Sequence, residues 1–100
     1  MRIEYLPHAV EDLKEIRSHY LEVGGKPLAL KMVRQIREEV KALADNPYLA
    51  QPYEIVPGIR RLVVADGVFL VFYGVTERIE VLHVRRAERA PATAEDMPHV

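Results

Sequence analysis

Three apolar segments separated by two short polar turns occupy residues 59–86, and they constrain the fold more than any other part of the chain. The middle segment, VFLVFY at residues 68–73, is apolar along its whole length, so both of its alternating faces need cover. The dipeptide Asp66-Gly67 before it suits the positive φ angles of a hairpin turn, and a second turn falls around residues 76–78. The sequence therefore predicts an antiparallel meander with residues 68–73 as its middle strand.

Two segments with helical periodicity precede the meander. Apolar residues recur at intervals of four and three over residues 9–23 and again over residues 29–43, as in helices that bury one face. Gly24-Gly25 favours a break between them, and Pro27 suits the first turn of the second helix. Asn46-Pro47 ends that helix near residue 45, because the residue before a proline is pushed out of the helical region. A short link between matching stripes predicts an antiparallel helical hairpin. The two stripes are Ala9, Leu13, Ile16, Tyr20, Val23 and Ala29, Val33, Ile36, Val40, Leu43.

The remaining segments complete the predicted fold. Residues 2–6 alternate over a short length and are followed by Pro7, as expected of a strand at a sheet edge. Residues 47–58 carry three prolines and are expected to form an irregular connection. The element order is then β-α-α-β-β-β. It predicts an α+β fold in which the helical hairpin packs on one face of a mainly antiparallel four-stranded sheet, with the other face partly open.

Length and composition limit the possible organisation of the chain. One hundred residues suffice for one domain with a modest core, which we expect to span residues 1–89. Residues 90–100 contain two prolines and no periodicity, so a flexible or loosely docked C-terminal tail is expected. The sequence has no cysteine, no signal-peptide pattern and no apolar run of the ~20 residues that span a bilayer. We therefore expect a cytoplasmic protein without disulfides and without a membrane partner.

Arginine is concentrated in the second half of the chain. The net charge of −1 argues against a strong nucleic-acid binder, but residues 59–89 hold six arginines, four acids and no lysine. Arginine is suited to bidentate contact with carboxylates or phosphates, although its stem also covers apolar surface at a sheet edge. The expected residues for contact with a partner or target are Arg60, Arg61, His83, Arg85, Arg86 and Arg89.

The sequence contains no catalytic motif. A Gly-rich phosphate loop, a metal-ligand spacing and a nucleophile elbow are all missing, so neither a cofactor nor a metal is expected. Ser18, the only serine, falls within a predicted helix. Among the four histidines, His19 and His99 are expected to have no chemical role, and His8 is isolated in the sequence.

His83 is the one histidine within the predicted sheet. Strict alternation places it on a face with Ile79, Val81 and Arg85, and places Glu80, Leu82, Val84 and Arg86 on the other. It could act as a general acid or base near arginines, or it could be a partly buried histidine that donates to a backbone carbonyl. We favour the second interpretation, because alternation puts no second acid or base beside His83.

The ordered set of these segments resembles a known family over residues 2–89. A first strand is followed by Ala9, Asp12, Leu13, Ile16, Tyr20, then by Ala29, Ile36, Leu43, Asn46-Pro47, then by GIRRL at 58–62, VFY at 71–73 and IEVLHV at 79–84. This pattern is similar to that of the RelE/ParE superfamily, the toxins of bacterial type II toxin–antitoxin pairs. The resemblance implies a small α+β toxin in a hetero-oligomer with a cognate antitoxin, whose C-terminal segment wraps and neutralises it.

The superfamily divides by target, and the sequence resembles its ParE branch more closely. RelE-like members cut mRNA on the ribosome with Arg and Lys on the open sheet face and a C-terminal Tyr or His, whereas ParE-like members poison DNA gyrase. Arg60 and Arg86 stand near RelE-type basic positions, but residues 68–70 are apolar where a cleaving member carries a catalytic Arg. After Arg86 there is no tyrosine, and the only histidine is His99.

The resemblance therefore implies a toxin that arrests growth by binding DNA gyrase. A ribosome-dependent mRNA endonuclease that uses Arg60, Arg61, His83 and Arg86 stays open as an alternative. So does a toxin-fold protein that has lost its activity and binds only its antitoxin.

Overall fold

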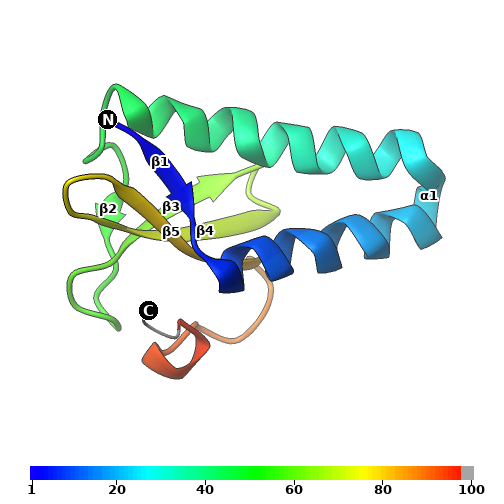
Figure 1. Cartoon of the computed structure of the whole chain (residues 1–100). Coiled ribbons are helices and arrows are strands. Elements are labelled where there is room, and N and C mark those ends of the chain that lie inside the picture. Colours follow the sequence, from blue (N-terminus) through cyan, green and yellow to red (C-terminus); the bar gives the residue numbers. More distant parts are fainter. Residues whose placement is uncertain (98–100) are drawn as a thin grey trace.

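The computed structural model describes residues 1–97 and contains a helical hairpin packed against a five-stranded sheet (Figure 1). The elements in chain order are β1 (Ile3–Tyr5), α1 (Pro7–Lys41), the 3-10 turn η1 (Ala42–Ala44), β2 (Gln51–Pro52), β3 (Arg60–Val64), β4 (Phe69–Val75), β5 (Ile79–Arg86) and the 3-10 turn η2 (Ala94–Asp96). The strand order is β1-β5-β4-β3-β2. Only β1 and β5 pair in parallel; the other neighbours are antiparallel. The predicted α+β class is confirmed.

The predicted helical hairpin is confirmed as two arms of α1. Gly25 interrupts the helix with a φ of 81°, a value that side chains with a Cβ rarely adopt, and Pro27 follows in the first turn of the second arm. The first arm begins at Pro7 instead of near Ala9. Proline is tolerated there because a helix leaves the N–H groups of its first turn unpaired, so the missing N–H costs no hydrogen bond. Within residues 1–97, no helix combines the length and the apolar character that crossing a membrane requires.

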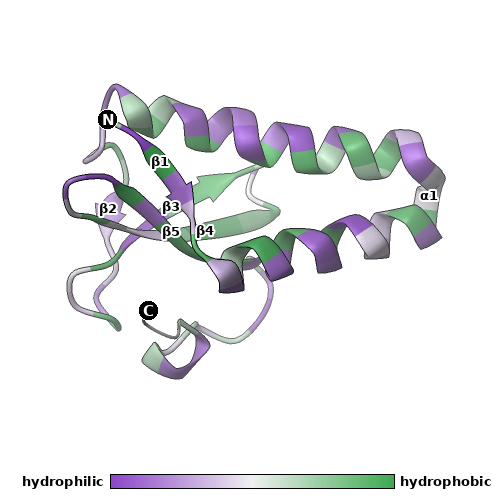
Figure 2. Cartoon of the chain, in the orientation of Figure 1, coloured by the Kyte–Doolittle hydropathy of each residue, from purple (hydrophilic) through white to green (hydrophobic). Residues whose placement is uncertain are grey.

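The main core lies between α1 and one face of the sheet. Both predicted stripes contribute to it, except for Val23, Ala29 and Val33 near the junction of the arms. Val23 is 64% exposed because the arms project beyond the sheet toward that junction (Figure 1). Hydrophobic residues recur along both arms and through β4 and β5 (Figure 2). The buried members of this cluster are Ala9, Leu13, Ile36, Val40, Leu43, Ala50, Val64, Ala65, Phe69, Val71, Tyr73, Ile79, Val81 and Val84.

The predicted meander is confirmed, with β4 between β3 and β5. Its first turn takes positive φ angles at Ala65, Asp66 and Gly67. Val68 belongs to this turn and not to the strand, and it is 43% exposed. From Phe69 onward, alternate residues of β4 enter two cores: Phe69 packs under α1 and Phe72 packs on the opposite face.

A fifth strand corrects the prediction of four. Gln51 and Pro52, expected within an irregular connection, pair with Arg61 and Arg60 at the free edge of β3. Two residues are too few to show alternation in a sequence. Proline is tolerated at such an edge because its missing N–H leaves no ladder partner unpaired.

The second sheet face is partly open, as predicted: Arg61 and Val63 of β3 are exposed there, whereas the residues of β4 and β5 on this face are covered. A second cluster of buried residues packs there: Leu6, Tyr53, Val56, Ile59, Phe72, Leu82, Ala92 and Met97. The hydroxyl of Tyr53 donates to the carbonyl of Ala92 at 2.8 Å. Ala92 and Met97 therefore hold the first part of the predicted tail against the sheet, whereas His99 lies outside the described residues.

A β-bulge corrects the predicted faces of β5. Phe72 pairs with His83 but Tyr73 pairs with Val81, so Leu82 is an extra residue on β5. An extra residue reverses the alternation that follows it. Val84 therefore joins Ile79 and Val81 in the core under α1, and Leu82 turns to the second face. His83 pairs with Phe72 and Arg85 pairs with Leu70, so both lie on the face of the second cluster.

Candidate functional site

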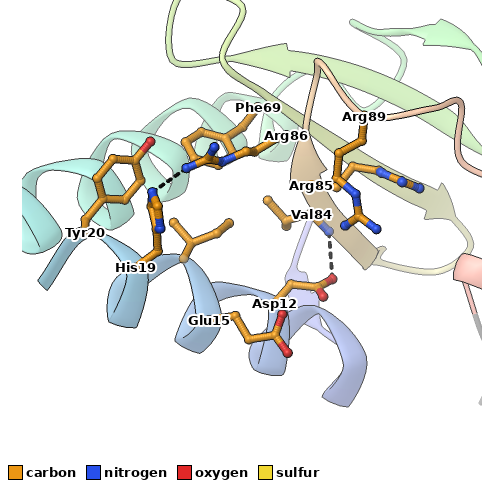
Figure 3. A pocket seen from close by; sticks show the side chains of 10 residues that line it. Asp12, Glu15, His19, Tyr20, Phe69, Val84, Arg85, Arg86 and Arg89 are labelled. Carbon is orange, nitrogen blue, oxygen red and sulfur yellow. Dashed lines mark hydrogen bonds between the residues drawn. The ribbon is translucent and has the colours of Figure 1, made fainter. Parts of the chain in front are cut away.

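A cavity of about 300 Å³ lies between the first arm of α1 and the C-terminal end of β5 (Figure 3). Charged groups from both elements border an apolar wall. The lining residues are Asp12, Glu15, Ile16, His19, Tyr20, Phe69, Val84, Arg85, Arg86 and Arg89. The edge of the Tyr20 ring packs against Phe69 at 6.2 Å between centroids, which makes the wall continuous with the core.

Arg86 spans this cavity. One guanidinium nitrogen donates to Nε2 of His19 on α1 (Figure 3), and the other lies 3.2 Å from the carboxylate of Glu88. A guanidinium only donates hydrogen bonds, so Nε2 of His19 is the acceptor in this contact. Arg86 is 39% exposed and Glu88 is 75% exposed, so water or a partner reaches both groups. His19, for which no chemical role is expected from the sequence, therefore positions Arg86.

Arg85 points away from Arg86 and is buried. Its guanidinium donates to Asp96 of η2 at 3.1 Å, and its Nε has no partner among the described residues. The backbone N–H of Thr93 and the Arg85 guanidinium lower the pKa of Asp96 below its usual value. Arg85 therefore ties the C-terminal segment to the sheet, and little of it is available to a partner.

The structure separates the predicted arginines into two groups. Arg86 pairs with Phe69 on one side of β4, and Arg60 pairs with Tyr73 on the other. These two positions are four residues apart along β4, about 13 Å. Arg60 donates to the carbonyl of Ala50 at 2.7 Å.

Aromatic rings hold the arginines of β3. The guanidinium of Arg60 lies 4.9 Å from the centre of the Tyr48 ring, and that of Arg61 lies 5.6 Å from the centre of the Tyr53 ring. Arg85, Arg86 and the exposed Arg89 instead border the cavity beside α1.

His83 is buried and bonded to a carboxylate. Its Nδ1 lies 2.7 Å from Oδ2 of Asp12, which corrects the expectation of a backbone carbonyl as its partner. The same oxygen accepts the N–H of Val84 at 3.0 Å (Figure 3), because β1 ends at Tyr5 and leaves this part of the β5 edge unpaired. The His83 ring stacks on Phe72 at 5.9 Å, and its Nε2 is buried without a partner in the described residues.

Asp12, His19 and His8 are the polar residues of this region that the sequence reasoning missed. His8 and Asp12 are four residues apart on the first turns of α1, a spacing that places two side chains on one helix face. This spacing was the available signal. It indicates nothing by itself until β5 brings His83 to the same place.

Comparisons with known proteins agree with this fold. Residues 3–91 match the family described as ParE toxin of type II toxin-antitoxin system, parDE. The chain belongs to the ParE toxin family. A relative from Sinorhizobium fredii named "Putative toxin Y4kP" is 32% identical over 88 residues, which are 88% of this chain and 90% of the relative.

A solved structure extends the likeness to three dimensions. A chain from the chromosomal ParDE toxin–antitoxin system of P. aeruginosa superposes with a TM-score of 0.79 at 34% identity, over 88% of this chain and 97% of that one. This protein is thus a ParE-like toxin of a type II toxin–antitoxin system, a family that implies an antitoxin partner. The family match includes the arginines of both groups and ends at residue 91, before the buried Met97.

Proposed function

We propose that this ParE-family toxin arrests growth by binding DNA gyrase, and that its cognate antitoxin prevents that binding. A gyrase-directed role also assigns the protein to the cytoplasm, where DNA is handled.

The burial of His83 is the observation that carries this proposal. A general acid or base must come within about 2.6–3.2 Å of the proton that it moves. Nδ1 of His83 is occupied by Asp12, and Nε2 is buried against Phe72. Neither nitrogen is free to reach a ribose hydroxyl, which disfavours the nuclease alternative.

Cover on the second sheet face supports the same conclusion. In the RelE-like members, the basic residues that cut mRNA stand on an open sheet face. In this toxin that face carries Phe72 and Leu82, packed under Tyr53 and Met97. An mRNA substrate would have to displace this apolar cluster before it reached β4 and β5.

We assign target and antitoxin contacts to the accessible arginines. Arg86 and Arg89 border the cavity beside α1, and Arg61 is exposed on β3. Arginines that keep access to solvent suit carboxylates on an antitoxin segment or on gyrase. Arg85 contributes indirectly, because it holds η2 through Asp96.

The decisive experiment compares the two target classes directly. Purified toxin is added to gyrase supercoiling assays and, separately, to translating ribosomes whose mRNA ends are mapped. The expected result is loss of supercoiling, restored by the co-purified antitoxin, with intact mRNA. Ribosome-dependent cuts together with normal supercoiling would establish the nuclease alternative instead.

A further inference from the structure

Three side chains that can ligate a metal ion converge where the start of α1 meets the edge of β5. His8 and Asp12 come from α1 and His83 from β5. Nδ1 of His83 lies 2.7 Å from Oδ2 of Asp12 and 3.2 Å from Nε2 of His8. Nε2 of His8 lies 3.7 Å from the same Asp12 oxygen. One atom of each side chain thus points into a common space.

The spacing of these atoms fits a tetrahedral metal. Ligand atoms at about 2.0–2.1 Å from a Zn²⁺ ion stand about 3.3 Å apart. The three observed separations of 2.7, 3.2 and 3.7 Å lie on either side of that value. Shifts of about half an ångström would therefore complete three corners of a tetrahedron.

Hydrogen bonding cannot link all three side chains at once. Nδ1 of His83 carries either one hydrogen or one lone pair, yet it faces both Asp12 and His8 within hydrogen-bond distance. If it donates to Asp12, it has no second hydrogen for Nε2 of His8. If it accepts from His8, its lone pair faces a carboxylate oxygen. A cation in the common space would accept lone pairs from all three atoms.

The surroundings hold two ligands in place and leave one side open. Asp12 is fixed by the N–H of Val84 at 3.0 Å, and the His83 ring by its stack on Phe72. His8 has 38% of its side chain exposed, so an ion can reach the cluster from solvent. Contacts of this kind, which orient the ligand side chains, support metal binding.

We propose that His8, Asp12 and His83 form a binding site for a first-row divalent metal ion with tetrahedral preference, Zn²⁺ foremost. Two imidazoles and one carboxylate suit zinc and its neighbours in the series, whereas Ca²⁺ and Mg²⁺ take mainly oxygen ligands. The bound ion fastens the first turn of α1 to β5. This site is independent of the gyrase proposal, since its occupation requires no target.

Cobalt is the direct probe. The full chain, purified without a histidine tag and stripped of metal, is titrated with Co²⁺ and followed by visible absorption. A tetrahedral site gives intense d–d bands that Zn²⁺ then abolishes by displacement. Zn²⁺ is also expected to raise the melting temperature in a concentration-dependent manner, because it binds the folded state.

Two variants of α1 give a matched comparison. His8→Gln removes a half-exposed ligand and is expected to lower the affinity for Co²⁺ by at least about tenfold, since even an outer-shell substitution costs that much. His19→Gln, on the same arm but outside the cluster, is expected to leave the titration unchanged. Asp12→Asn keeps an acceptor for Val84 and is expected to weaken binding as well.

Three results would overturn the proposal. They are a wild-type spectrum without tetrahedral bands, a melting temperature insensitive to Zn²⁺, and equal affinities in His8→Gln and His19→Gln. None of these measurements depends on toxicity, so failure of the gyrase assay leaves them interpretable.

Discussion

The guanidinium of Arg85 donates to the carboxylate of Asp96 at 3.1 Å, and this contact joins β5 to η2. Arg85 is 6% exposed, whereas Asp96 reaches solvent. The ion pair sits beside the apolar contacts of Ala92 and Met97, so charge and burial hold the same segment on the second sheet face. Arg85 is therefore a link within the fold, while its neighbour Arg86 remains accessible.

Acid should loosen the C-terminal segment. Because the folded-state pKa of Asp96 is lowered from 3.8, its contribution to stability is complete above about pH 3.8 and is lost as pH falls through the lower folded value. After correction for the intrinsic exchange rate at each pH, the protection of the amides at residues 92–97 should fall over that range. In Asp96→Asn the segment should already exchange faster at neutral pH, and the loss of protection in acid that depends on Asp96 should be absent. Identical exchange profiles in the two proteins would contradict a role for the ion pair.

Stability should depend on the first residue of β4 and not on the residue before it. Phe69 is fully buried under α1, so Phe69→Ala is expected to lower the free energy of unfolding by ~3–5 kcal/mol. Val68→Ala is the matched control. Val68 lies in the turn and is 43% exposed, so its loss should cost no more than ~0.5 kcal/mol. Urea unfolding gives both values, and equal midpoints would show that β4 does not begin a central strand.

Target engagement should depend on the arginines at the cavity. The double charge reversal Arg86→Glu and Arg89→Glu is expected to raise the toxin concentration for half-inhibition of gyrase roughly 30-fold, equivalent to the ~2 kcal/mol of an interface hot spot. Arg34→Glu on the second arm of α1 does not line the cavity and should change little. Circular dichroism controls for folding. Inhibition that is equally sensitive to both variants would locate the contact elsewhere.

His83 should be dispensable for toxicity if no proton has to move. His83→Gln keeps a donor for Asp12 and is expected to retain inhibition of gyrase and arrest of growth. Removal of a true general acid or base would instead lower turnover by ~10²–10⁴-fold. Growth arrest, supercoiling and mRNA cleavage are compared side by side for wild type and variant, with thermal melts to verify folding. A variant that folds but loses mRNA cuts made by the wild type would favour the nuclease.

Association with the antitoxin should slow as salt is raised. Exposed arginines attract acidic residues over distances that salt screens, with a Debye length of about 8 Å at physiological ionic strength. The association rate should therefore fall more steeply with salt than the dissociation rate rises. Stopped-flow mixing of toxin and antitoxin at several salt concentrations measures both. An association rate that does not respond to salt would rule out charge steering.

The sequence by itself determined the elements that depend on neighbouring residues. Helical spacing with Gly25 and Pro27 predicted the hairpin of α1, because backbone preference and a 3.6-residue period are local properties. The apolar run and the Asp66-Gly67 turn predicted the meander and its central strand for the same reason. The ordered set of these segments also indicated the toxin family that the comparisons confirmed.

Tertiary structure alone decided the site. The extra residue Leu82 reverses the faces of β5, and no local pattern marks it, because a bulge depends on the register with β4. Cover by Met97 depends on a segment without periodicity that packs through a few long-range contacts. His83 meets Asp12 across 71 positions because β1 ends early and exposes the β5 edge to α1. Such contacts depend on how strands pair and helices pack, so they cannot be predicted from patterns among neighbouring residues in the sequence.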